Sequence, residues 1–263
     1  MTLADNENEQ QFETLPYYKY QAFPAGDQEK LGWVRDILIE HKLFFAGRQS
    51  FNDPFDCVVP SLLQTPGTFY KRYVEELLDK DFPDAPEAEW LAKRERLMSV
   101  KALEGMREDV QKEIDKAGIT CFCKVRDDIL MWAHYADKHK GLCFEFDGSP
   151  NCNFFGDAQP VKYEDFTYVL PGEDSGKTME RVILTKSKHW SYEREYRIFR
   201  PDMACQKIDY PVELLTGIIF GCMMDKNEVQ LLRQWVREGN CCVAFFEAKP
   251  KANEFGLDIV RID

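Results

Sequence analysis

The sequence of 263 residues lacks any apolar run close to the roughly 20 residues that a membrane-spanning helix needs. Its beginning has no apolar segment of the signal-peptide kind, so we expect a cytoplasmic protein with no membrane partner. Disulfide bonds are not expected either. The cysteine count is nine, and an odd number in a chain of this length favours reduced thiols over a disulfide framework.

Basic residues are in short supply. The chain has 34 Lys and Arg against 46 Asp and Glu, which gives a formal net charge of −12. Such a chain repels phosphate backbones unless its basic residues gather on one face. Glu193 and Glu195 interrupt the densest basic stretch, so nucleic acid is not an expected partner. That stretch contains Lys186, Lys188, Arg194, Arg197 and Arg200.

Signatures of several enzyme classes are missing as well. The sequence has no Walker loop, no dinucleotide-binding glycine fingerprint and no nucleophile elbow. His134 and His139 are five positions apart, about 140° around a helix, and so cannot form the i, i+4 pair of metalloproteases. Cys121 and Cys123 share a strand face, but no second pair has ligand spacing. We therefore predict no metal site and no tightly bound cofactor.

Hydrophobic residues make up 44% of the chain and aromatic residues 13%, which is enough for a substantial core. Apolar residues at helical spacing, with their capping residues, predict helices at 31–41, 69–79, 87–116, 127–138, 176–186 and 225–237. Short apolar or alternating runs predict strands at 17–23, 42–46, 119–123, 141–146, 160–169, 192–199, 206–210, 214–220, 242–246 and 257–262. We expect the strands 192–199 and 206–210 to pair with each other.

These elements predict an α+β fold with a mixed or antiparallel sheet at its core. Residues 1–16 are polar, acidic and without periodicity at their start, and are expected to form a disordered tail. Residues 17–263 are expected to form a single α+β domain. A mainly helical insertion at about 66–117 carries many charges and is interpreted as a packed, solvated subdomain.

The first candidate site segment is the turn at 51–56, with the sequence FNDPFD. Asn and Asp favour turns, and the residue before Pro avoids the helical region. One interpretation is a rigid turn with local side-chain capping. The other is that Asn52, Asp53 and Asp56 point polar groups into a cleft from a fixed loop.

The second candidate segment is the short helix predicted at 127–138. Helical geometry would place His134, Tyr135 and Lys138 at adjoining positions of one face. An imidazole beside a phenol can hydrogen-bond a sugar or position a reacting group. The alternative is that Trp132 and Tyr135 only pack and that His134 makes a structural hydrogen bond.

The third candidate segment is the strand predicted at 192–199. Strand alternation would place Glu193, Glu195 and Arg197 on one face. Such charges are expensive to bury unless they are paired or used, and two carboxylates so close should move each other's pKa values apart. The alternative is a solvent-facing edge strand with a self-paired charge ladder. Positive charge for an anionic ligand would come from just upstream, from Lys186, Lys188 and His189.

Together these segments resemble domain-of-unknown-function family 2971, which is found mainly in bacterial proteins. The motifs that carry the resemblance are FNDPFD at 51–56, MWAHYA at 131–136 and WSYEREYR at 190–197. The resemblance runs from Tyr18-Lys19-Tyr20 to Gly221. The family name implies no reaction.

The stretch Glu193-Arg194-Glu195 is also similar to the Glu-x-Glu strand of mono-ADP-ribosyltransferases. This resemblance implies that NAD is the substrate, that Glu195 hydrogen-bonds its nicotinamide ribose, and that Glu195 stabilises an oxocarbenium-like transition state. Glu193 would activate or orient the acceptor. The chain departs from that family in lacking its Ser-Thr-Ser strand and in having Tyr18-Lys19-Tyr20 where a first-strand Arg or His is expected.

The same resemblance implies that His134 and Tyr135 hold the ribose or stack the nicotinamide, and that Lys19 or Arg197 meets the pyrophosphate. The predicted catalytic residues are therefore Glu195, Glu193, His134 and Tyr135. The predicted ligand-binding residues are Lys19, Tyr20, Asn52, Asp53, Asp56, Trp132 and Arg197.

Three functions remain open at this point. The first is an NAD-consuming ADP-ribosyltransferase or glycohydrolase, such as a bacterial toxin or a phage-defence effector. The second is a module that binds a nucleotide or a protein partner without turnover. The third is a hydrolase or nuclease in which Asp53, Asp56 and Glu193 hold a divalent cation.

Overall fold

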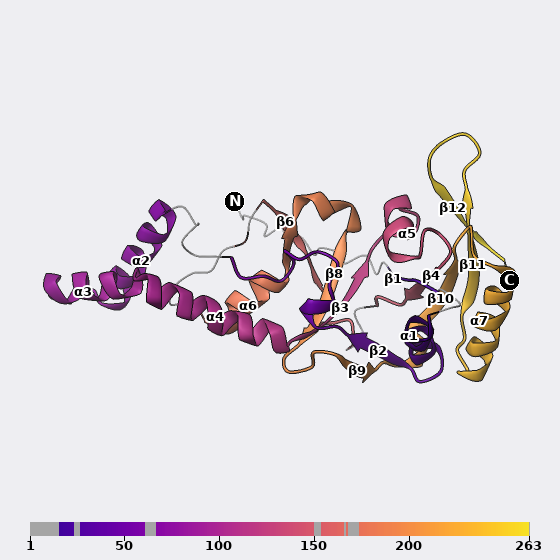
Figure 1. Cartoon of the computed structure of the whole chain (residues 1–263), viewed down its shortest axis with the longest axis horizontal. Helices are drawn as coiled ribbons and strands as arrows, with labels where there is room; N and C mark the ends of the chain where they lie inside the picture. Colours follow the sequence, from indigo (N-terminus) through magenta and orange to yellow (C-terminus); the bar gives the residue numbers. More distant parts are fainter. Residues whose placement is uncertain are drawn as a thin grey trace, which may run out of the picture.

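A computed structural model of the chain describes residues 16–23, 27–60, 67–149, 154–165, 167 and 174–262. Its centre is an eight-stranded sheet with the strand order β12-β11-β10-β4-β1-β3-β8-β5 (Figure 1). Neighbouring strands are antiparallel, except for β10 and β11, which are parallel. The predicted α+β class with a mixed sheet is confirmed. The predicted tail lies outside the described residues, apart from Pro16.

The strands of this sheet are β1 (Tyr17–Gln21), β3 (Gly118–Cys123), β4 (Leu142–Phe146), β5 (Gln159–Pro160), β8 (Glu195–Arg200), β10 (Leu215–Phe220), β11 (Ala244–Pro250) and β12 (Leu257–Arg261). Two smaller pairs are β2 (Lys42–Phe45) with β9 (Gln206–Asp209), and β6 (Lys162–Glu164) with β7 (Thr185–Ser187). The helices are α1 (Gln28–Leu38), α2 (Gly67–Asp81), α3 (Glu87–Leu97), α4 (Val100–Lys116), α5 (Ile129–Tyr135), α6 (Ser175–Ile183) and α7 (Lys226–Glu238), with short 3₁₀ turns η1 (Arg48–Ser50), η3 (Lys188–Glu193) and η4 (Val212–Leu214).

Helices begin where a side chain can accept a hydrogen bond from an otherwise unpaired backbone N–H. Asp27 does so for α1, Asp128 for α5 and Asp225 for α7. The single helix predicted at 87–116 is interrupted instead. Ser99 accepts from the N–H of Ala102 and starts α4 as a separate helix. The apolar residues keep their helical spacing on both sides of Ser99, and this is why a single helix was predicted.

The sheet is covered on both faces. Apolar residues of α1 and α7, among them Leu38 and Leu232, pack with Phe144 and Phe220 of the sheet in one cluster. On the opposite face, α5 contributes Trp132 to a second cluster. Figure 1 shows α2, α3 and the first part of α4 extending away from the sheet, within the stretch where helices were predicted. Within the described residues, the helices are all too short or too polar to cross a membrane.

The predicted pairing of the strand at 192–199 with that at 206–210 is wrong. β8 pairs with β3 and β5, whereas β9 pairs with β2. Left-handed residues Asp202 and Cys205 lie between the two strands and redirect the chain. Sequence proximity favoured a hairpin, but the partner of β9 lies more than 160 positions away.

β1 and β3 are neighbours in the sheet but pair at one position only, with Tyr18 opposite Cys123. By contrast, β1 pairs with β4 along its whole length. Past Tyr18 the side chain of Lys19 bridges the separated strands, donating to Thr120 Oγ1 and to the Cys121 carbonyl, both at 3.1 Å. This local separation of two central strands is where the candidate site lies.

Candidate functional site

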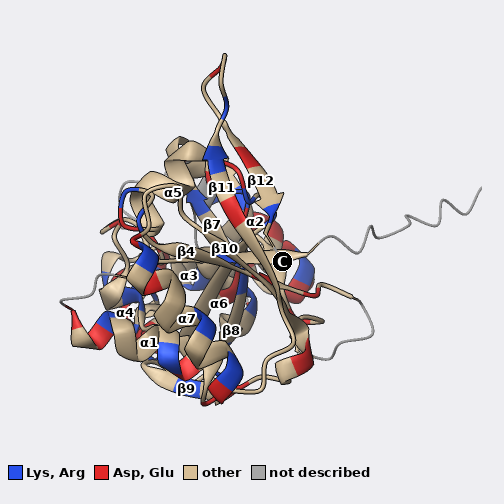
Figure 2. Cartoon of the chain, turned by 90° about the vertical axis from the view of Figure 1, so that its right-hand side faces the viewer, with Lys and Arg blue, Asp and Glu red and all other residues tan. Residues whose placement is uncertain are grey.

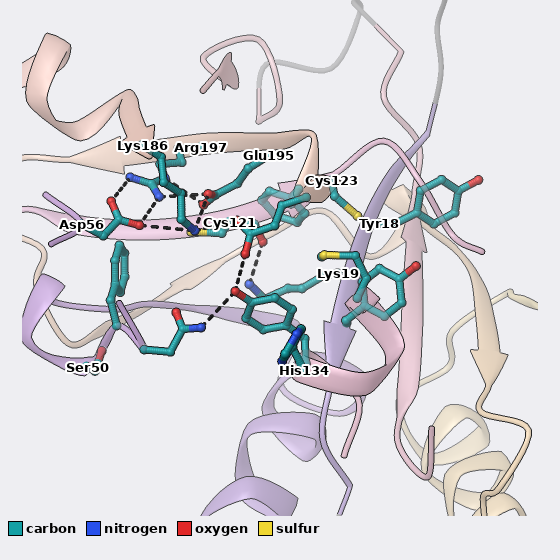
Figure 3. A pocket seen from close by; sticks show the side chains of 17 residues that line it. Tyr18, Lys19, Ser50, Asp56, Cys121, Cys123, His134, Lys186, Glu195 and Arg197 are labelled. Atoms are coloured by element: carbon teal, nitrogen blue, oxygen red, sulfur yellow. Dashed lines mark hydrogen bonds and ion pairs between the residues drawn. The ribbon is translucent and has the colours of Figure 1, made fainter. Parts of the chain in front are cut away.

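A cavity of about 370 Å³ is lined by residues of β1, β3, α5, β7, β8 and the segment 50–56. All three predicted site segments therefore contribute to one pocket. Figure 3 shows their side chains converging, with Asp56 and Arg197 at one end and Tyr18 at the other. Aromatic rings, among them Tyr18, Tyr20 and Phe51, form much of its wall.

The floor of the pocket is organised by Arg197. Its guanidinium is bidentate to Asp56, with N–O distances of 2.8 and 2.6 Å, and bidentate to Glu195, with distances of 2.8 and 2.9 Å. One more N–H bonds the Ile183 carbonyl at 2.6 Å. All five guanidinium donors are thus used inside the protein. Arg197 was predicted to bind ligand, but it has no N–H left for one.

Lys186 is the second buried cation of the floor. Its ammonium lies 2.6 Å from Glu193 Oε2, 3.2 Å from Glu195 Oε2 and 3.4 Å from Asp56 Oδ2. Burial opposes its charge, but the carboxylates of Glu195, Asp56 and Glu193 raise the pKa of Lys186 above the ordinary lysine value. Lys186 was predicted only as a source of charge for an anion. Its ammonium instead lies among three carboxylates and donates hydrogen bonds to two of them.

Tyr135 links the floor to the turn at 51–56. Its hydroxyl donates to Glu193 Oε1 and accepts from the Asn52 side-chain amide at 3.1 Å. A continuous chain of polar contacts therefore runs from Asn52 through Tyr135, Glu193 and Lys186 to Glu195. The turn, the helix and the third segment meet in one hydrogen-bonded network, as Figure 3 shows.

Glu193, Glu195 and Arg197 are 2%, 6% and 0% exposed, so the solvent-facing alternative is wrong. The predicted strand alternation is also wrong. Glu193 ends η3, and Arg194 adopts a left-handed conformation with φ 44° before β8 begins at Glu195. Glu193 therefore reaches the cluster from a turn. A strand prediction could not reveal this reversal, because Arg rarely adopts positive φ.

The two glutamates of the floor have pKa values displaced in opposite directions. Burial raises the pKa of Glu193, against the opposing influence of Lys186. Burial would also raise that of Glu195, but the Arg197 guanidinium and Lys186 bring it down to about 2. Glu195 therefore stays ionised at neutral pH. Glu193 is the carboxyl of the pair that titrates closer to neutrality, which is the arrangement expected where acid and base roles are separated.

Hydrogen-bonding capacity separates the two glutamates further. Each carboxylate can accept about four hydrogen bonds. Glu195 accepts two from Arg197 and one from Lys186, and the Cys121 thiol also bonds it. Glu193 accepts one from Lys186 and one from Tyr135. Glu193 therefore keeps acceptor positions for a ligand, whereas Glu195 does not.

Two thiols and one amine complete the inner wall. Burial raises the pKa values of Cys121 and Cys123, so both are neutral thiols rather than nucleophilic thiolates. Burial lowers the pKa of Lys19, and nearby Glu195 opposes that effect. Lys19 makes two hydrogen bonds and keeps a third donor. Among the described residues of the lining, Lys19 is a cation with a donor left for a ligand, and its predicted role in ligand binding stays a prediction.

Other predicted residues have structural contacts. Trp132 is fully buried and donates its indole N–H to the Arg126 carbonyl, so the packing alternative holds for it. Asp53 turns back to accept from the Phe55 N–H, which is the local capping alternative. Tyr20 lines the pocket with its ring, while its hydroxyl bonds the Val125 carbonyl. Trp132 and Asp53 are outside the pocket lining.

His134 lies at the edge of the pocket and is exposed. Its ring centroid is 6.4 Å from that of Trp190 and 6.3 Å from that of Tyr192, which lie on η3. The predicted helix through Lys138 ends earlier, at Tyr135, because the next turn is left-handed. Trp190 and Tyr192 were not predicted as site residues, although both belong to the third motif.

In the part of the chain that the structure describes, basic residues are paired with acidic ones and do not form a binding stripe. Lys188 and Arg200 pair with Asp165 and Asp157, both at distances below 3 Å. In the view of Figure 2, Lys and Arg are interspersed with Asp and Glu over α1, α7, β11 and β12. The positive charge expected upstream of the third segment is therefore neutralised locally.

Residues 131–198 match the family model described as "Protein of unknown function (DUF2971)". The match confirms, over these residues, the resemblance to domain-of-unknown-function family 2971 that was predicted from the sequence. It spans α5 to β8, and so includes Tyr135, Glu193, Glu195 and Arg197 but neither β1 nor the turn at 51–56. No curated protein and no solved structure matches the chain.

Proposed function

We propose that this protein is an NAD-consuming enzyme, a glycohydrolase or ADP-ribosyltransferase, with its catalytic carboxylate at Glu193. The observation that carries the proposal is the buried pair of Glu193 and Glu195 on the floor of an aromatic-walled pocket, with pKa values displaced in opposite directions. Strongly perturbed carboxyl groups in a cleft are characteristic of functional sites.

The geometry favours Glu193 over Glu195 as the group that contacts substrate. Glu195 is saturated by Arg197, Lys186 and Cys121, and serves to position those cations. Glu193 has free acceptor positions and a raised pKa, as suits a general base. This reverses the roles implied by the Glu-x-Glu resemblance, in which Glu195 contacts the ribose.

In the proposed reaction, the glycosidic C–N bond breaks and nicotinamide leaves with the bonding electron pair. The ribose C1′ becomes positively charged and then bonds the oxygen of water or of an acceptor hydroxyl. The proton of that hydroxyl goes to Glu193. Three carboxylates against two cations on the floor leave a net negative charge, counting Asp56, Glu193 and Glu195 against Lys186 and Arg197. That charge favours the ribose cation electrostatically.

The test is release of nicotinamide from NAD by the purified protein, followed by chromatography. We expect Glu193→Gln to lower the rate about 10²-fold or more, the usual contribution of a positioned base. Glu113→Gln is the matched control, because Glu113 pairs with Lys116 on the exposed face of α4. Release that is unchanged in Glu193→Gln would refute the assigned role.

A second candidate is a module that binds a nucleotide without turnover. It is favoured by one observation, the complete internal pairing of Arg197 and Lys186, which is also how a purely structural ion cluster is built. NAD that binds with no nicotinamide release, in water or with protein acceptors added, would decide for this candidate.

The metal-dependent hydrolase is less well supported by the geometry. The Lys186 ammonium occupies the centre of the three carboxylates, where a divalent cation would have to lie. Among the residues that the structure describes, no group of three or more His, Cys, Asp and Glu side chains is arranged to hold a metal ion. Asp53, one of the proposed ligands, is turned toward its own backbone.

A further inference from the structure

The pocket floor presents hydrogen-bond acceptors rather than donors to an incoming molecule. Arg197 uses every N–H on Asp56, Glu195 and the Ile183 carbonyl, and the Lys186 ammonium is ion-paired with Glu193, Glu195 and Asp56. Neither cation can bind an anion without breaking a buried ion pair. The free positions belong to Glu193, so the inner part of the ligand must be a donor such as a hydroxyl group.

Beside the pocket, aromatic rings gather around His134, which is one of the lining residues. His134, Trp190 and Tyr192, which we call the mouth cluster, have ring centroids 6.1 to 6.4 Å apart. His134 lines the pocket, and the Trp190 ring lies 5.2 Å from the Lys186 ammonium, so the cluster borders the floor network. His134 is exposed, and Trp190 and Tyr192 are half-buried, which leaves ring surface for stacking.

Lys19 adds one donor to the lining of the pocket. It keeps one N–H after its bonds to Thr120 and Cys121, and can meet a single acceptor such as a ring or hydroxyl oxygen. The ligand that fits has a planar ring at one end and several hydroxyl groups at the other, with no anionic group on the floor.

We infer that the pocket binds a nucleoside unit, with its planar base stacked on the mouth cluster and its sugar hydroxyls donating to Glu193. This deepens the proposed function, because it places the ribose at Glu193 and any phosphate outside the floor. Base stacking on aromatic side chains tolerates different bases, so the sugar supplies the selectivity and the ring supplies affinity.

The first test uses calorimetric titration of the full chain with adenosine and with nicotinamide riboside. Removing the 2′ and 3′ hydroxyls should weaken binding tenfold or more, because the acceptors of Glu193 would be left unpaired. The 5′-monophosphates should bind no more tightly than the nucleosides. Equal binding of the dideoxynucleosides, or much tighter binding of inorganic phosphate or the monophosphates, would overturn the inference.

The second test uses variants of the mouth cluster and the floor. Trp190→Ala should weaken nucleoside binding roughly tenfold to a hundredfold, and Trp190→Phe should retain most of the affinity because it keeps a ring. Trp90→Ala is the matched control, since Trp90 lies on α3 and donates a hydrogen bond to Asp79. Unchanged affinity in Trp190→Ala would refute the stacking site. Nucleoside affinity retained in Trp190→Phe would show that a substitution at this position leaves the protein folded.

The two proposals can fail separately. If nucleosides bind with this pattern but NAD is not cleaved, the inference stands and the catalytic proposal falls. If NAD is cleaved but affinity depends neither on the sugar hydroxyls nor on Trp190, the catalytic proposal stands and the inferred binding mode falls.

Discussion

Arg197 holds two buried carboxylates. Arg197→Met would leave Asp56 and Glu195 partly unpaired in the buried floor. Breaking a buried ion pair costs about 3–5 kcal/mol, and we expect a loss of that order in the free energy of unfolding, measured with urea. Arg72→Met is the control, because its exposed pair with Glu76 should contribute little to stability. Equal effects of the two substitutions would show that the floor network is not structural.

Tyr135 tunes the carboxyl that we propose to be catalytic. Its hydroxyl donates to Glu193 and favours the charged form, against the larger effect of burial. Tyr135→Phe should therefore raise the pKa of Glu193 further, and should cost about 1 kcal/mol of stability for the lost hydrogen bond. Carbon-13 NMR titration of the Glu193 carboxyl measures the shift. A lower pKa in Tyr135→Phe would contradict the assigned contact.

At the scale of elements, the turn after α5 depends on close backbone packing. Residues 137–139 have φ values of 46°, 55° and 69°, which are costly for residues other than glycine. A Cβ on Gly221 would lie 2.2 Å from the His139 carbonyl oxygen. Gly221→Ala should therefore destabilise the protein by about 2 kcal/mol or more. Gly105→Ala, in open space on α4, should stabilise it by up to about 1 kcal/mol. Thermal unfolding of both variants checks the opposite signs.

The extent to which elements could be predicted follows from the range of the interactions that form them. Helices α1 and α7 have local apolar spacing and capping residues. The bounds of α7 were predicted to within one residue, and those of α1 three residues too late at each end. The partner of β9 and the left-handed Arg194 depend on contacts that no local pattern records. The same holds for the site. Its polar residues could be recognised, but the central place of Lys186 depends on the meeting of distant segments.

For the molecule as a whole, stability should depend on pH through two opposing carboxyl groups. The pKa of Glu195 is lowered to about 2 and that of Glu193 is raised. Ionised Glu195 therefore stabilises the folded state above its unfolded pKa of about 4.3, and this contribution is lost as the pH falls toward 2. Glu193 has the opposite effect. Its ionisation destabilises the folded state as the pH rises through and above its unfolded pKa.

The difference in the free energy of unfolding between each variant and the natural protein isolates the contributions of Glu195 and Glu193 from those of the other acidic residues. As the pH is raised from about 1 to 5, Glu195→Gln should lose stability relative to the natural protein, by up to about 3 kcal/mol for a shift of this size. As the pH is raised from about 4 to 7, Glu193→Gln should gain relative stability. Urea unfolding at a series of pH values measures both slopes. Slopes of the same sign would show that the floor does not separate the two glutamates, and the assignment of Glu193 as the titrating group would then be wrong.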